Sequence, residues 1–150
     1  ESRAGGVSLS CMYITWETYQ CGNVLSLIVS CGWGFDMNTH SVYLYDTATG
    51  EQMTTAQLLE TLQVEPETFL AAVRQAAAER FDGKYAGIGG DTDELVAERR
   101  AWTLSDENIN LDVMPYADAA GNLYVYLPIG SIAGAASYEE PLTLDLGAAG

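Results

Sequence analysis

Two stretches of alternating residues, connected by the turn segment YQCGN, constrain the fold of this chain more than any other feature. Residues 7–18 read VSLSCMYITWET, and residues 23–33 read NVLSLIVSCGW. Period-two alternation predicts strands whose successive side chains point to opposite faces. Gly22 and Asn23 supply the positive φ that a tight hairpin turn requires. We therefore predict an antiparallel hairpin over these two stretches.

The alternation also assigns each side chain to a face. On the first strand, one face carries Val7, Leu9, Cys11 and Tyr13, and the other carries Ser8, Ser10, Met12, Ile14 and Trp16. On the second strand, one face carries Leu25, Leu27, Val29 and Cys31, and the other carries Ser26, Ile28 and Ser30. A third strand is predicted over residues 41–46, with Val42 and Leu44 directed inward and Tyr43 and Tyr45 on the other side.

The stretch DTATGEQMTTAQLL, residues 46–59, predicts a turn followed by a capped helix. Gly50 can take the positive φ of the turn. Thr54 and Gln57 have the spacing of a capping box, and Met53 and Leu58 that of a hydrophobic staple. These structural roles explain the stretch without a ligand.

Two further helices and three strands are predicted downstream. One helix begins at Pro66, a residue favoured at the first helical position, and its apolar side chains share one face: Phe69, Leu70, Val73, Ala76, Ala77 and Phe81. The segment FDGKYAGIGG ends it, and a short helical piece capped by Asp91 or Thr92 runs to about Arg99. Strands are predicted over residues 101–104, 109–114 and 122–128, joined by SDEN and PYADAAG.

Strands, a helical middle and further strands predict the α+β class. We expect an antiparallel sheet with two or three helices packed on one face. The 150 residues suit a single domain. We expect its core within residues 7–132 and flexible ends at residues 1–6 and 147–150. No apolar run approaches the roughly 18 residues that a membrane helix needs, so we expect no membrane insertion by this segment.

The charge of the chain restricts its partners. Twenty-one acids against six bases give a net charge of −15, with Lys84 as the one lysine. Nucleic acid is not an expected partner, because phosphate binding requires basic clusters. A cationic partner would be attracted, and more strongly at low salt. The alternative is that the acidic surface serves solubility alone.

The three cysteines leave two interpretations open. Cys11, Cys21 and Cys31 lack the short paired spacing of zinc sites. In the predicted hairpin Cys11 and Cys31 come close enough for a bridge, with Cys21 free at the turn. Alternatively, all three are thiols that behave as small hydrophobic residues.

No cofactor is expected, and two polar motifs are assigned to structure. Asp36, Asn38 and His40 alternate, but one carboxylate, one amide and one imidazole form a poor metal-ligand set. The Asp91-x-Asp93-Glu94 motif after GIGG lacks the residues of a phosphate loop or a calcium loop, and helix capping explains it.

An enzyme is not the preferred interpretation. The sequence contains no nucleophile elbow, and its sole histidine, His40, lies in a predicted loop. A pair of carboxylates could cleave a glycoside, but 21 acids would bring some pair together in any fold. A carboxylate-dependent hydrolase therefore stays as an alternative function.

Aromatic residues form the candidate binding site. Tyr43 and Tyr45 share one face of their strand, and Tyr124 and Tyr126 share the corresponding face of theirs, opposite aliphatic residues. If helices cover the aliphatic face, the four tyrosines line the other face, with Trp16 and Trp33 near its rim. Such a platform can stack on sugars or anchor a protein. Cross-strand aromatic pairing without a ligand is the alternative. We predict that Tyr45→Ala and Tyr126→Ala weaken partner binding more than folding.

The order of the motifs resembles a known extracytoplasmic domain. The segments GNVLSLIVSC, SVYLYDTATGEQMTTAQLL and WTLSDENINLDVMPYADAAGNLYVYLPI follow one another as in the domain of unknown function at the end of RsiV-type anti-sigma factors. The same domain precedes the catalytic domain of PdaC-type peptidoglycan deacetylases. The likeness covers roughly residues 7–132. One departure is the longer loop GWGFDMNTH before His40.

The resemblance implies an α+β domain of the bacterial cell envelope, secreted or tethered by a segment outside this chain. It implies binding rather than catalysis, and in RsiV-type proteins the bound partner is lysozyme, a basic protein. We therefore expect a binding or sensor domain that recognises a cationic protein or a cell-wall glycan. An accessory domain of a cell-wall enzyme is the alternative. No binding residue is carried over from the family.

Overall fold

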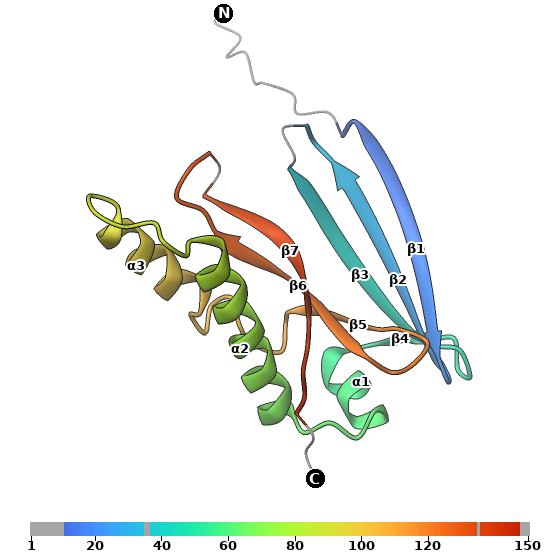
Figure 1. The fold of residues 1–150 in the computed structure, drawn as a ribbon. Helices are drawn as coiled ribbons and strands as arrows, with labels where there is room; N and C mark the ends of the chain where they lie inside the picture. Colours follow the sequence, from blue (N-terminus) through green and yellow to red (C-terminus); the bar gives the residue numbers. More distant parts are fainter. Residues whose placement is uncertain (1–10, 35–36, 135, 148–150) are drawn as a thin grey trace, which may run out of the picture.

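The computed structural model describes residues 11–34, 37–134 and 136–147. The expected flexible ends, residues 1–6 and 147–150, lie outside them except for Gly147. The chain folds into seven strands and three helices in the order β1-β2-β3-β4-α1-α2-α3-β5-β6-β7 (Figure 1). The strands form two antiparallel sheets of four and three strands, with strand orders β1-β2-β3-β4 and β5-β6-β7. The predicted α+β class is confirmed, but the single expected sheet is two sheets.

The predicted hairpin is present as strands β1 (Tyr13–Cys21) and β2 (Val24–Gly32). Cys21 pairs with Val24, so Gly22 and Asn23 form a two-residue turn. Gly22 has a φ of 56°, whereas Asn23 does not have the positive φ that we expected. Glycine at the first turn position supplies the necessary backbone freedom alone.

Strand β3 (Asn38–Asp46) pairs antiparallel with β2, and the short β4 (Gln52–Met53) pairs with β3. The turn between them uses Gly50, whose φ is 75° as predicted, and Gly50 N–H donates to the Asp46 carbonyl. Val42 and Leu44 face the core, also as predicted: Leu44 is buried and Val42 packs partly buried against it.

Helix α1 (Thr55–Thr61) begins at the predicted capping box. Gln57 N–H donates to Thr54 Oγ1 at 3.2 Å, and Thr54 N–H donates to Gln57 Oε1 at 2.8 Å. Leu58 is fully buried and Met53 packs against the same core. The stretch therefore has the structural role assigned to it.

Helix α2 (Pro66–Lys84) starts with proline at its first turn and buries Phe69, Ala72, Val73, Ala77 and Phe81. Helix α3 (Asp93–Thr103) extends beyond the predicted end near Arg99, so the strand expected at residues 101–104 is wrong. The Arg100 guanidinium donates to both Asp82 oxygens, which ties this part of α3 to α2.

The strand predicted over residues 109–114 is also wrong, because that segment is mostly turns. The Asn110 side chain donates to the carbonyls of Asp106 and Glu107, and its oxygen accepts from Asp112 N–H. Such local bonds compete with strand pairing. Strand β5 (Met114–Ala117) begins only at the last residue of that predicted strand and continues into the segment expected to be a loop.

Strand β6 (Leu123–Gly130) confirms the strand predicted at residues 122–128, whereas β7 (Ser137–Thr143) was not predicted. β7 lies beyond the expected core limit at residue 132, yet Leu142 and Leu144 are buried. Its proline, Pro141, fits its place at the edge of the three-stranded sheet.

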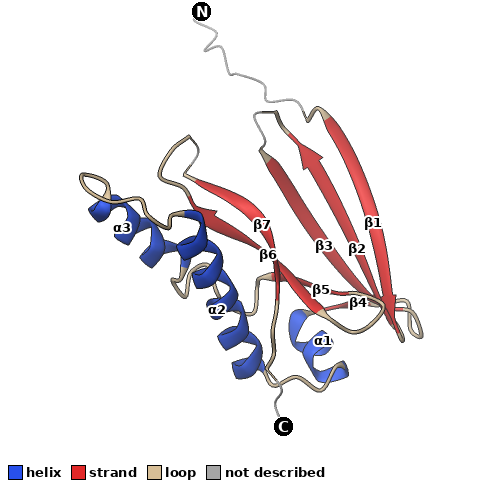
Figure 2. Cartoon of the chain, viewed as in Figure 1, coloured by secondary structure: helices blue, strands red, loops and turns tan. Residues whose placement is uncertain are grey.

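The molecule has three layers, seen in Figures 1 and 2. Helices α2 and α3 contact β6, and α2 also contacts β7, so both helices cover one face of the three-stranded sheet. The four-stranded sheet packs against the other side of that sheet through β3, β2 and β1. The main core contains Phe69, Val73 and Phe81 of α2 together with Leu123, Val125 and Leu127 of β6.

Candidate functional site

The four-stranded sheet has one face directed away from the rest of the molecule, which we call the outer face. The register places directly opposed residues on the same face. Trp16, Val29 and Ser41 are aligned across the three strands, and so are Thr18, Leu27 and Tyr43. The outer face therefore comprises Ile14, Trp16, Thr18 and Gln20 of β1, Leu25, Leu27, Val29 and Cys31 of β2, and Thr39, Ser41, Tyr43 and Tyr45 of β3.

The outer face is largely apolar, at least partly exposed and uncharged. Trp16 is 70% exposed, Ile14 66% and Tyr43 40%, while Leu25, Leu27 and Val29 are partly exposed. None of its residues is Asp, Glu, Lys, Arg or His. Contiguous exposed apolar surface in a soluble domain marks an interaction site.

Trp33 and a disulfide lie at the end of the outer face that contains Cys31 and Thr39. The Trp33 indole N–H donates to Thr39 Oγ1 at 2.8 Å, which places this half-buried side chain beside the end of the outer face. Cys11 and Cys31 form a disulfide, and Cys21 is free. Of the two interpretations left open by the sequence, the bridge is therefore the one that holds.

Only part of the predicted aromatic platform exists. Trp16, Tyr43 and Tyr45 lie on the outer face, but Tyr124 and Tyr126 belong to the other sheet. There they pack with Tyr116 and Ile28 between the two sheets, and Tyr126 is only 8% exposed. The expectation that all four tyrosines line one face was wrong, because the strands that carry them are not in one sheet.

Between the sheets the aromatic rings form a stacked array. Tyr116 stacks on Tyr19, Tyr124 and Tyr126 with ring centroids 5.0 to 5.7 Å apart, and Tyr126 stacks on His40 at 4.0 Å. These contacts join β1 and β3 of one sheet to β5 and β6 of the other. The array is thus part of the inter-sheet packing.

The phenol groups of this array are held neutral. The hydrogen bond that Tyr19 donates to Glu17 raises the pKa of Tyr19 to about 12. Burial is the main cause that raises the pKa of Tyr116 and of Tyr126 above the usual tyrosine value. None of these tyrosines is therefore poised as a base or nucleophile at neutral pH.

The histidine of the metal motif has another partner. Glu139 Oε1 lies 2.6 Å from His40 Nδ1 and also accepts from His40 N–H at 2.5 Å. Asn38 accepts from the Tyr13 hydroxyl, and Asp36 lies outside the described residues. Across the part of the chain that is described, no group of His, Cys, Asp and Glu is arranged to hold a metal ion.

The acidic motif near residue 91 lies where helix α3 starts. Thr92 is the N-cap residue, although its side chain does not make the capping bond, and Asp93 and Glu94 occupy the first turn. Acids are favoured at that end of a helix because of its dipole. This position agrees with the structural role predicted for the motif.

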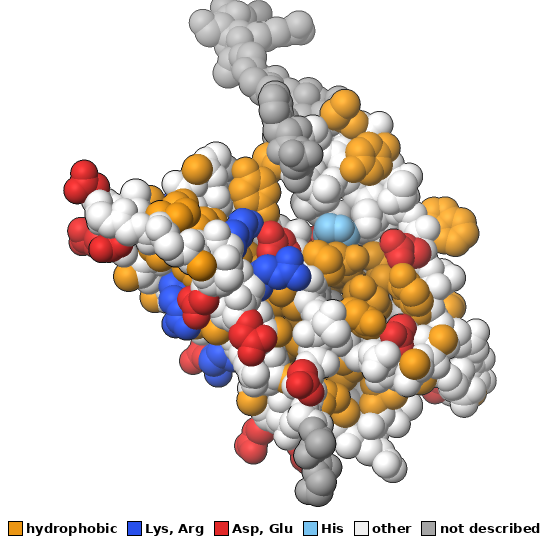
Figure 3. Space-filling view, in the orientation of Figure 1, with side chains coloured by type: hydrophobic (Ala, Val, Ile, Leu, Met, Phe, Trp, Pro, Cys, Tyr) orange, Lys and Arg blue, Asp and Glu red, His pale blue; other side chains and the backbone are white. Residues whose placement is uncertain are grey.

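The basic residues that the structure describes lie on helices α2 and α3, across the three-stranded sheet from the outer face. Residues 4–73 contain no Lys or Arg. Arg74, Arg80 and Lys84 are on α2, and Arg99 and Arg100 are on α3. In Figure 3 the blue side chains gather over the helices, and the four-stranded sheet shows none.

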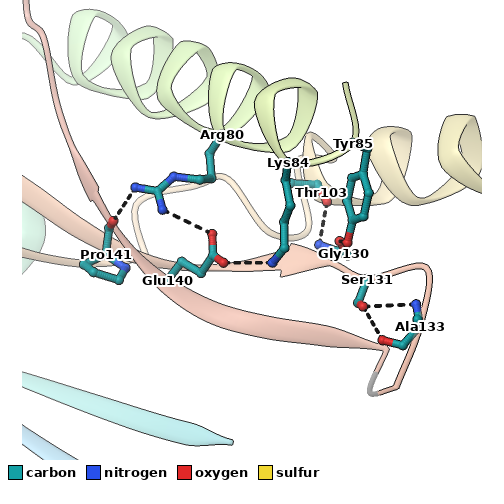
Figure 4. A network of polar contacts seen from close by, with 9 residues as sticks. All are labelled: Arg80, Lys84, Tyr85, Thr103, Gly130, Ser131, Ala133, Glu140 and Pro141. Carbon is teal, nitrogen blue, oxygen red and sulfur yellow. Dashed lines mark hydrogen bonds and ion pairs between the residues drawn. The ribbon is translucent and has the colours of Figure 1, made fainter. Parts of the chain in front are cut away.

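A hollow of about 590 Å³ lies on this basic side, but its cations are already paired. Glu140 lies 2.8 Å from Lys84 Nζ and 3.7 Å from Arg80 Nη1, and Arg80 also donates to the Pro141 carbonyl (Figure 4). Because Glu140 pairs with both cations and Glu79 also lines the hollow, two acids balance the two bases and the hollow does not provide a free anion site.

Sequence reasoning missed how much of the outer face is aliphatic. It assigned Ile14 and Trp16 to one face of their strand and Leu27 and Val29 to one face of the next, but did not align the two faces. The sequence did contain the information needed to align the two faces, because a two-residue turn at Gly22 and Asn23 sets the register of the whole hairpin.

Comparisons with known proteins add no relative. No family model matches the chain, and neither the curated proteins nor the solved structures searched include a significant match. Within the described residues, no helix combines the length and the apolar character that crossing a membrane would require.

Proposed function

We propose that this chain is a non-catalytic recognition domain of the bacterial cell envelope, and that its partner binds to the outer face. The observation that carries the proposal is the exposure of Trp16, Ile14 and Tyr43 on one uncharged apolar surface. Exposed aromatic anchors surrounded by aliphatic side chains are typical of the centre of a protein interface.

The charge distribution favours a basic protein as the partner. The chain carries −15 overall, and its first 73 residues contain a single base, Arg3. No acid lies on the outer face itself, but the exposed Glu17 belongs to β1 and Asp46 ends β3. A cationic partner would therefore be attracted beside the outer face and bound at its apolar centre. This agrees with the resemblance to RsiV-type domains, whose partner is lysozyme.

An extracytoplasmic location is supported by the disulfide between Cys11 and Cys31. Structural disulfides persist mainly in oxidising compartments. The same location follows from the resemblance to envelope domains. A sensor role and an accessory role beside a cell-wall enzyme both fit this location, since each requires a recognition surface.

A cell-wall glycan is the second candidate ligand. Trp16, Tyr43 and Tyr45 present rings beside the hydroxyl groups of Thr18, Thr39 and Ser41 on the same face. Rings of this kind stack on sugars while hydroxyl groups bond to them. Glycan binding would be insensitive to salt, whereas binding of a basic protein would weaken as salt screens the charges.

A salt series with two ligands tests the proposal. Binding of lysozyme and of purified peptidoglycan is measured for the native chain, for a Trp16→Ser/Tyr43→Ser variant and for an Ile88→Ser control. Ile88 is 44% exposed but lies outside the outer face. We expect the double variant to bind at least about tenfold more weakly, because buried aromatic anchors contribute about 2 kcal/mol or more each. The control should bind normally.

The proposal is wrong if neither ligand binds or if both variants bind equally well. Tyr126→Ala serves as a second comparison. Because Tyr126 is buried between the sheets, we now expect this variant to lose stability, in contrast to Tyr45→Ala on the outer face. The sequence-based prediction for Tyr45 stays a prediction.

A further inference from the structure

Within the described residues, strand β1 is an unpaired edge of the four-stranded sheet. It is the first strand in the order β1-β2-β3-β4, and no other described segment pairs with the edge of β1 that faces away from β2. Its nine residues extend about 30 Å at the usual rise of a strand. Natural edge strands are commonly blocked by lysine, proline or a short length. The sequence YITWETYQC contains neither lysine nor proline, and its one charged residue is Glu17.

The hairpin register determines which backbone groups of β1 are unpaired. The pair that closes a two-residue turn is hydrogen bonded, and bonded pairs alternate with unbonded pairs along the ladder. Counting back from Cys21 and Val24, the residues bonded to β2 are Cys21, Tyr19, Glu17, Thr15 and Tyr13. The N–H and C=O groups of Ile14, Trp16, Thr18 and Gln20 therefore point to the open edge.

The side chains along this edge are exposed on both faces of the strand. Residues 12–18 are all exposed, and Figure 1 shows β1 at the margin of the molecule, away from the helices. Met12 is 72% exposed and Tyr13 53%, and the neighbouring Ile14 and Trp16 are exposed as well. The strand thus presents both free backbone groups and apolar surface.

We propose that β1 binds an extended segment of a basic partner protein as an additional strand of the sheet. Residues of that segment bonded to Ile14, Trp16 and Thr18 would place their side chains on the outer face and extend its apolar surface. The intervening residues would lie beside Thr15 and Glu17, where a lysine or arginine can pair with Glu17. The inference rests on the proposed recognition function and specifies how the partner is held.

Charge favours this occupant over a second copy of the chain. A symmetric pairing of two β1 strands would bring two molecules of net charge −15 together. Neither copy has a Lys or Arg within residues 4–73 to offset the acids of the other. Repulsion acts over about 8 Å at physiological salt, which spans a strand pairing. A segment with alternating apolar and basic residues fits the same edge without this repulsion.

Hydrogen exchange with a defined peptide provides the test. The probe is a capped peptide that alternates valine with arginine and threonine, and a second peptide replaces each arginine with glutamate. We expect the arginine peptide to slow exchange of the Ile14, Trp16 and Thr18 amides at least about tenfold. The amides of Thr15 and Glu17 should change little, because they already donate to β2. The glutamate peptide should bind at least about tenfold more weakly.

Two substitutions at one position separate backbone pairing from side-chain packing. Thr18→Pro removes an N–H that points to the open edge, a position where an edge strand tolerates proline. Thr18→Val keeps that N–H. We expect Thr18→Pro to abolish peptide binding and Thr18→Val to preserve it, with similar thermal unfolding temperatures. If Thr18→Pro fails to fold, Glu17→Lys replaces it and should reverse the preference between the two peptides.

Several results would overturn the inference. Absence of peptide binding, binding that leaves the three edge amides unprotected, or binding unaffected by Thr18→Pro each contradicts strand addition. A concentration-dependent dimer that Thr18→Pro dissociates would show that a second copy occupies the edge. In each case lysozyme binding that depends on Trp16 and Tyr43 would still support the recognition function. Loss of that dependence is what would contradict the function itself.

Discussion

At the scale of single residues, the close approach of one backbone segment to another explains why position 130 is a glycine. Gly130 at the end of β6 lies against α3, where an added Cβ would be 2.9 Å from the Arg99 carbonyl. Its N–H donates to Thr103 Oγ1 at 2.9 Å, and its carbonyl accepts from the Tyr85 hydroxyl (Figure 4). Glycine allows this contact because it has no side chain.

Thr103→Val is a test of this contact. Thr103 is fully buried, and its hydroxyl accepts from Gly130 N–H while it donates to the Arg99 carbonyl. Valine keeps the volume but leaves Gly130 N–H without a partner, so we expect a loss of about 1–3 kcal/mol. Urea unfolding measures it. Thr103→Ser, which keeps the hydroxyl, should be clearly less destabilising; equal losses would contradict the hydrogen-bond explanation.

At the scale of elements, local signals predicted the hairpin, the 46–50 turn, α1 and α2. Each of these depends on residues close in sequence, such as the Gly22 turn or the Thr54 capping box. The two strands predicted wrongly, at residues 101–104 and 109–114, lie where side-chain hydrogen bonds and ion pairs favour a helix or turns over strand pairing. Asn110 bonds to nearby backbone, and Arg100 holds α3 to α2.

The capping box of α1 gives a prediction at this scale. Thr54→Ala removes the oxygen that accepts from Gln57 N–H, and we expect the free energy of unfolding to fall by about 1 kcal/mol. Thr54→Ser keeps that oxygen and should lie within a few tenths of a kcal/mol of the native chain. Chemical denaturation compares the three proteins. A serine variant as unstable as the alanine variant would show that the cap is not the cause.

At the scale of the whole molecule, a four-stranded and a three-stranded sheet are held together by an interface of polar and aromatic side chains. His40 of β3 and Glu139 of β7 join the sheets at their part-buried margin, and the tyrosine array fills the space further in. The three-stranded sheet therefore separates the helices from the four-stranded sheet, whose outer face points away from both. This arrangement leaves the outer face and the β1 edge accessible.

Glu139→Ala tests the contact between the sheets. It removes the acceptor of both His40 N–H and the His40 ring, so we expect stability to fall by about 1–3 kcal/mol. Glu98→Ala is the matched control, because it removes the same charge from an exposed position on α3. Thermal unfolding followed by tryptophan fluorescence compares them. Equal stability of the two variants would contradict a structural role for the Glu139 contact.

The sequence by itself determined the strands and helices whose signals are local, the α+β class, and which side chains share a face within each strand. Tertiary structure alone decided that the strands divide into two sheets, which moved Tyr124 and Tyr126 away from Tyr43 and Tyr45. It also decided that β1 is an edge and that β7, with little alternation, completes the second sheet. The physical reason is that side-chain alternation is set by the local backbone, whereas the pairing of distant strands depends on what the rest of the chain packs against.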